Sequence, residues 1–166
     1  QNAGVTAAWQ IALSLAESEY FITSDNDIYV PDSSNNLPST LVSNDWLGRL
    51  IRFMDQRPDF GAISLHPHTL IGDASFDPND PEDVKEVPWC GAVMRIMRRD
   101  AVKKVNGWAD DSDPLIRGDR GHEERLVCSR LQAGGYKTGR TTRLLAYHPF
   151  GDNWGYPEEI SQGEQG

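Results

Sequence analysis

Three polar residues, Asp25-Asn26-Asp27, stand together directly after a short apolar stretch of the chain. Side chains alternate between the two faces of an extended strand, so Asp25 and Asp27 can point the same way and share one ion. Carboxylate oxygens suit Mg²⁺ or Mn²⁺, and these ions keep open positions that a diphosphate can fill. The spacing alone favours a plainer interpretation, an Asx-rich turn with solvated carboxylates.

The residues before this cluster predict how it is positioned. Apolar residues recur at three- and four-residue steps over residues 4–17, which predicts a helix with one apolar stripe. Residues 20–23 are aromatic or β-branched and predict a short buried strand. The acidic cluster is therefore expected at the carboxyl end of a strand.

Further helices and strands alternate along the rest of the chain. The pattern predicts a helix that begins at Asn44 or Asp45 and ends at Pro58, a strand at 61–65, a helix from Asp100 to Val105 with a left-handed stop at Asn106-Gly107, a helix at 123–133 and a strand at 142–147. Such alternation is typical of a mostly parallel sheet with helices on both faces. These sheets bind ligands outside the carboxyl ends of their strands.

Length and composition limit what the motifs can mean. A chain of 166 residues fits a single domain, residues 1–166, and its formal charge of -9 argues against a nucleic-acid partner. No long uncharged apolar run is present, so we expect no membrane span. Cys90 and Cys128 have no neighbouring cysteine, which favours a reduced cytoplasmic setting and leaves a single disulfide open.

Four groups of residues follow one another in an order that belongs to a known family. They are Asn2-Ala3-Gly4 before the first helix; residues 20–31 with Trp46-Leu47; Gly91 with Arg98-Arg99 and Asn106-Gly107-Trp108; and Glu123-Glu124 with Arg130-Leu131 and Gly134-Gly135-Tyr136. In this order and at these spacings the chain resembles a family 2 glycosyltransferase of the GT-A fold.

The resemblance implies an α/β GT-A fold and a metal-dependent transfer of sugar. Asp25 and Asp27 would hold Mn²⁺ or Mg²⁺ against the diphosphate of a UDP- or GDP-sugar donor, and Glu124 would deprotonate the acceptor hydroxyl in an inverting displacement. Direct displacement at an anomeric carbon needs such a base and such an electrophile. A plainer role for Glu123 and Glu124 is to stabilise a helix N-terminus through the helix dipole.

Other residues enter the expected site on weaker grounds. His148 follows the last predicted strand and is a candidate third metal ligand, although a histidine beside Pro149 is as often a surface residue. Trp89 is a candidate for stacking on a sugar face, and a core position is its alternative role. The remaining candidate substrate-binding residues are Asn2, Gly4, Asn26, Gly91 and Glu123.

The resemblance begins part-way into the family pattern. The family's first strand, its nucleobase-binding loop and the next two strands precede the motif that Asn2-Ala3-Gly4 resembles. We therefore expect residues 1–166 to be an N-terminally truncated, partial catalytic domain, with a missing N-terminal segment and a homo-oligomer both open. Two alternative functions remain: a non-catalytic carbohydrate- or protein-binding relic of the fold, and a nucleotidyltransferase.

Overall fold

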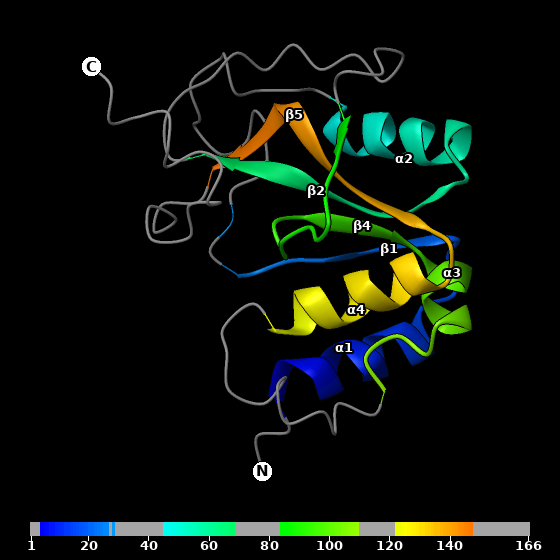
Figure 1. Cartoon of the computed structure of the whole chain (residues 1–166). Helices are drawn as coiled ribbons and strands as arrows, with labels where there is room; N and C mark the ends of the chain where they lie inside the picture. The colour runs from blue at the N-terminus through cyan, green and yellow to red at the C-terminus, as the bar shows by residue number, and fades with distance from the viewer. Residues whose placement is uncertain (1–3, 27, 29–44, 69–83, 110–121, 148–166) are drawn as a thin grey trace, which may run out of the picture.

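Helices and strands alternate over the part of the chain that the structure describes. The computed structural model describes residues 4–26, 28, 45–68, 84–109 and 122–147, which form four helices and five strands. In chain order these are α1 (Gly4–Leu15), β1 (Tyr20–Thr23), α2 (Trp46–Gln56), β2 (Phe60–His68), β3 (Val84–Glu86), β4 (Arg95–Arg98), α3 (Arg99–Lys104), α4 (His122–Ala133) and β5 (Lys137–Tyr147) (Figure 1). None of the described helices is long and apolar enough to cross a membrane.

The five described strands form one sheet in the order β1-β4-β2-β5-β3. β2 and β5 pair in parallel, whereas β1 with β4, β2 with β4 and β3 with β5 pair antiparallel. An α/β architecture with flanking helices is therefore confirmed, but the expected mostly parallel sheet is wrong for the described residues. Two strands that were not predicted from the sequence cause the difference: β4 runs antiparallel to β1 and β2, and β3 runs antiparallel to β5.

Three of the five described strands run in the same direction, so their carboxyl ends lie on the same side of the sheet. β4 lies between β1 and β2 and runs against both, so β1 and β2 point the same way, and β5 is parallel to β2. The carboxyl ends of β1, β2 and β5 consequently lie along one side of the sheet, which we call the carboxyl edge. Asp25 comes two residues after β1 and lies at this edge.

Hydrophobic clusters cover both faces of the sheet. On one face α2 packs its buried residues against β2 and β4 through Leu50, Phe53, Met54, Ile63, Leu65 and Ile96. On the other face α1, α3 and α4 contribute Leu13, Ala101, Val102, Leu126, Val127 and Leu131. Figure 1 shows α2 on one side of the strands and α1 and α4 on the other.

Neighbouring residues of the strands supply the two clusters in turn. Ile63 and Ile96 belong to the α2 cluster, while Ala62 and Met97 belong to the opposite one. Side chains point alternately to the two faces of a strand, so a sheet covered on both sides is apolar at consecutive positions. This explains why the consecutive residues Ala62 and Ile63 of β2 are both apolar.

The helix ends agree in part with the sequence. Asp45 precedes α2 as expected, but its side chain makes no capping hydrogen bond and instead accepts one from Arg52 at 2.9 Å. α3 begins one residue before Asp100, so the predicted cap at Asp100 is wrong. Asn106 and Gly107 have φ angles of 65° and 50°, which confirms the left-handed stop.

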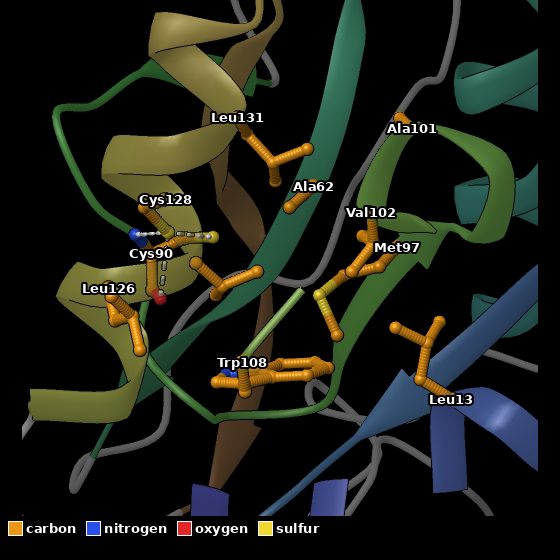
Figure 2. Close-up of a cluster of buried hydrophobic side chains, with 11 residues drawn as sticks. Leu13, Ala62, Cys90, Met97, Ala101, Val102, Trp108, Leu126, Cys128 and Leu131 are labelled. Atoms are coloured by element: carbon orange, nitrogen blue, oxygen red, sulfur yellow. Dashed lines mark hydrogen bonds between the residues drawn. The ribbon is translucent and has the colours of Figure 1, made fainter. Parts of the chain in front are cut away.

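Trp108 belongs to the buried cluster that α1 and α4 cover (Figure 2). It is 2% exposed, and its ring centroid lies 5.4 Å from that of Trp9 and 6.3 Å from that of Phe21. Its indole Nε1 donates a hydrogen bond to the carbonyl of Glu123 at 3.1 Å. Trp108 therefore ties the first turn of α4 to the core.

Replacing Trp108 by alanine should lower the free energy of unfolding by about 3–5 kcal/mol, because it empties a large buried site and frees the Glu123 carbonyl. Urea unfolding followed by circular dichroism measures this change. Leu47→Ala, at a position that is 40% exposed, is the control and should change stability by only about 0.5 kcal/mol. Equal losses in the two variants would contradict the burial of Trp108 in this cluster.

Candidate functional site

The backbone of Ala92 joins two of the predicted site residues. Its carbonyl accepts a hydrogen bond from the N–H of Asp25 at 3.0 Å, and its own N–H donates to Oε1 of Glu124 at 2.8 Å. Asp25 follows β1, while Glu124 lies in the first turn of α4. Two residues far apart in the sequence therefore meet at one residue of a third segment.

The segment that carries Ala92 is also fixed further along. The hydroxyl of Ser24 accepts a hydrogen bond from the N–H of Met94 at 3.4 Å and donates to the Asp25 carbonyl at 2.9 Å. Met94 has a φ of 44°, a left-handed conformation that is uncommon outside glycine. Such backbone persists only where its surroundings impose it, and it concentrates at functional sites.

Glu124 is a carboxylate of this site whose pKa is raised. Burial raises its pKa, the Ala92 N–H and the positive charge of Arg95 oppose the shift, and the negative charges of Glu123 and Asp25 add to it. The influence of Asp25 on this pKa agrees with the short path between the two groups through Ala92. A carboxylate with a raised pKa is a better proton acceptor than a solvated one, which suits a general base.

Arg95 is a fully buried cation below the site. Its Nε donates to the hydroxyl of Thr23 and its Nη1 to the carbonyl of Cys90, both at 3.2 Å. The guanidinium carbon lies 5.0 Å from the ring centroid of Trp9 and 5.9 Å from that of Trp108, an arrangement that favours a cation. Within the described ranges its Nη2 has no hydrogen-bond partner.

Sequence reasoning missed Arg95 and pointed to Arg98-Arg99 instead. A signal for Arg95 was present, because a charged residue inside an apolar strand needs partners and is seldom buried without them. Arg98 pairs in register with Tyr20, at the amino end of β1, and donates to the carbonyl of Met54 at 2.6 Å. Arg98 therefore lies at the opposite end of β1 from Asp25.

Three further candidates lie in the described part of the chain near Glu124 and Ala92. Gly91 is buried directly before Ala92, and Glu123 is held through its backbone carbonyl by the Trp108 indole. Trp89 is partly buried, and the guanidinium carbon of Arg125 lies 5.4 Å from its ring centroid. The protein's own arginine thus stacks at the ring that was expected to meet a sugar.

Two of the remaining candidates lie in the described part of the chain and three lie outside it. Asn26 is exposed beside Asp25, and Gly4 is the first residue of α1. Asn2, Asp27 and His148 lie outside the described residues.

Of the three expected metal ligands, only Asp25 lies among the described residues. Its carboxylate is exposed at the carboxyl edge, as a ligand shared with a bound diphosphate must be. Among the described residues, no group of three or more His, Cys, Asp and Glu side chains is placed to hold an ion. Ions such as Mg²⁺ are commonly held by one or two carboxylates plus phosphate oxygens and water, so Asp25 fits that kind of site.

Comparison with known proteins adds no assignment. No protein family model matches the chain, and no curated protein matches it.

The raised pKa of Glu124 gives stability a defined pH dependence. A raised carboxyl pKa contributes stability that is present below the pKa of the unfolded chain and is lost as pH rises through the folded value. Glutamine resembles the neutral acid at every pH, whereas the parent carboxyl ionises as pH rises. The melting temperature of Glu124→Gln minus that of the parent should therefore increase by a few degrees from about pH 4 to about pH 7. Differential scanning calorimetry across this range measures it.

Glu17→Gln, at an exposed position, controls for the loss of one glutamate charge. A difference in melting temperature between Glu124→Gln and the parent that is the same at both pH values would contradict the burial of the Glu124 charge.

Proposed function

We propose that the chain is a metal-dependent glycosyltransferase that moves a sugar from a nucleoside-diphosphate donor to an acceptor hydroxyl. One observation supports this most: Ala92 forms hydrogen bonds with both Asp25 and Glu124. Its carbonyl accepts from the backbone N–H of Asp25, and its N–H donates to the carboxylate of Glu124. The two groups have the roles that sugar transfer needs, since one can hold the donor's diphosphate side and the other can take the acceptor proton.

Glu124 is the proposed base, and its contacts define how it would act. The Ala92 N–H engages Oε1, which orients the carboxylate and leaves Oε2 as the atom that we assign to the acceptor proton. As the hydroxyl loses its proton to Oε2, its oxygen attacks the anomeric carbon from the face opposite the leaving diphosphate. This displacement inverts the anomeric configuration.

Asp25 is the proposed ligand on the donor side, with Asp27 and His148 as its partners from the sequence. Together they would hold Mn²⁺ or Mg²⁺, which would neutralise charge at the leaving nucleoside diphosphate. The Asp25 backbone is fixed to Ala92, so its carboxylate starts from a defined position. This preorganisation supports placement of the donor next to Glu124.

A binding module without catalysis is the second candidate. Glu124 accepts a backbone N–H at the start of a helix, a contact that also serves a purely structural carboxylate. The guanidinium at the Trp89 ring likewise limits one surface on which a sugar would stack. In this alternative the carboxylates of Asp25 and Glu124 tolerate substitution without loss of any activity.

Donor binding is tested by thermal shift with a panel of nucleoside diphosphates, with and without Mn²⁺. One base should raise the melting temperature by about 5–10 °C at ligand a hundredfold above Kd, and only with the metal. Asp25→Asn and Asp27→Asn should each abolish the shift. Asp100→Asn, an exposed aspartate of α3, is the matched control and should retain it. A shift that survives in both Asp25→Asn and Asp27→Asn would contradict the proposed metal ligands.

The catalytic role of Glu124 is tested by the pH dependence of transfer once a donor is known. A base must be ionised, so kcat/KM should fall as pH drops through the raised pKa of Glu124. Glu124→Gln should lose about 10²–10⁴-fold in kcat while retaining the thermal shift with donor diphosphate. Glu17→Gln should keep the parent rate, and an equal rate in Glu124→Gln would favour the binding module.

A further inference from the structure

Cys90 and Cys128 meet inside the cluster around Trp108 (Figure 2). Both are fully buried, and their sulfur atoms lie 3.6 Å apart although the residues belong to different segments, one before β4 and one in α4. The backbone N–H of Cys90 also points at the Cys128 sulfur, at 3.5 Å. The sequence left pairing of these two cysteines open, and the fold places them side by side.

The geometry is close to that of a disulfide. Two bonded sulfurs lie about 2.05 Å apart, so these atoms need to approach by only about 1.5 Å, which small rotations of the two side chains can supply. The Cys128 sulfur also contacts the backbone of Cys90, at its N–H and at its carbonyl oxygen.

The two sulfurs differ in acidity. The hydrogen bond from the Cys90 thiol lowers the pKa of Cys128, and the charge of Arg95 and the Cys90 N–H act in the same direction against burial. The same hydrogen bond and burial raise the pKa of Cys90. The thiolate is the attacking species in exchange, and the positive charge of Arg95 acts to lower the pKa of both thiols.

We propose that Cys90 and Cys128 are a dithiol that is oxidised to one intramolecular disulfide by an external disulfide. One of the two cysteines, as its thiolate, attacks a sulfur of the reagent, breaks its S–S bond and releases one thiol. The sulfur of the other cysteine then loses its proton, attacks the cysteine sulfur of the mixed disulfide and releases the second thiol. The two cysteines lose two electrons in total, and the reagent gains them as two thiols.

The cross-link has a defined structural effect. Cys128 lies one helical turn after Glu124 in α4, and Cys90 lies two residues before Ala92, the partner of Glu124. A disulfide between them fixes the distance between the two segments that form the Ala92–Glu124 hydrogen bond. This inference concerns the thiols alone and does not depend on the proposed glycosyl transfer.

Burial determines the rate at which the pair reacts. Both thiols are shielded in the native state, so exchange proceeds through local separation of α4 from the loop before β4. The reaction is therefore slow in native buffer and faster in low concentrations of urea that favour such opening. Once closed, the disulfide is equally shielded from reducing agents.

The test uses the full chain equilibrated with oxidised glutathione in low urea, then returned to native buffer. Intact mass should fall by the mass of two hydrogen atoms, with no glutathione adduct, and a non-reducing digest should yield one peptide pair containing Cys90 and Cys128. The melting temperature should rise by about 5–15 °C over the sample kept in dithiothreitol, since the bond restricts the unfolded chain.

Cys90→Ser and Cys128→Ser are the matched controls, and neither should gain melting temperature on oxidation. The comparison of oxidised and reduced parent chains needs no variant, so it stands even if a serine variant fails to fold. The proposal is overturned if the oxidised parent, after denaturation, still carries two thiols that react with iodoacetamide. It is equally overturned if the parent ends with glutathione on both cysteines.

Discussion

The buried guanidinium of Arg95 sets a constraint that the surrounding structure has to satisfy. A charge removed from water is costly unless partners replace its hydration, and the described segments replace it from several directions. Thr23 and Cys90 accept its hydrogen bonds, and the rings of Trp9 and Trp108 lie against it. Moving any of these segments away would expose or strand the charge, so β1, α1, the loop before β4 and the residues after α3 are held together around one cation.

The candidate site is built on top of this arrangement. Because Arg95 holds the carbonyl of Cys90, the next residues are presented with a fixed orientation, and Ala92 can bond to Asp25 on one side and Glu124 on the other. The positive charge of Arg95 also lowers the pKa of Glu124, against the effect of burial, and lowers the pKa of Cys128. One buried positive charge, at the place where three segments converge, therefore acts on both the proposed base and the cysteine pair.

Much of the local structure follows from sequence pattern. The helices near Val5 and Leu126 and the strand at Tyr20 were predicted because apolar periodicity and β-branched composition act over short distances. Asp25 and Glu124 were also singled out, on spacing and resemblance. The antiparallel β4 was missed, since nothing within a strand reports the direction of its neighbours, and the expected cap at Asp100 lies two residues after the observed N-cap, Arg98.

The sequence by itself determined the helices, the strands β1 and β2 and the later part of β5. It also determined that an acidic pair follows β1 and that a glutamate pair opens α4. Only the tertiary structure decided that Asp25 and Glu124 meet at Ala92, that Arg95 lies buried beneath them, and that the cysteines touch. The physical reason is the range of the forces. Periodicity and turn chemistry act between residues that are near in the sequence. These contacts instead join residues that meet only when β1, β4 and β2 pair in that order and helices cover both faces of the sheet.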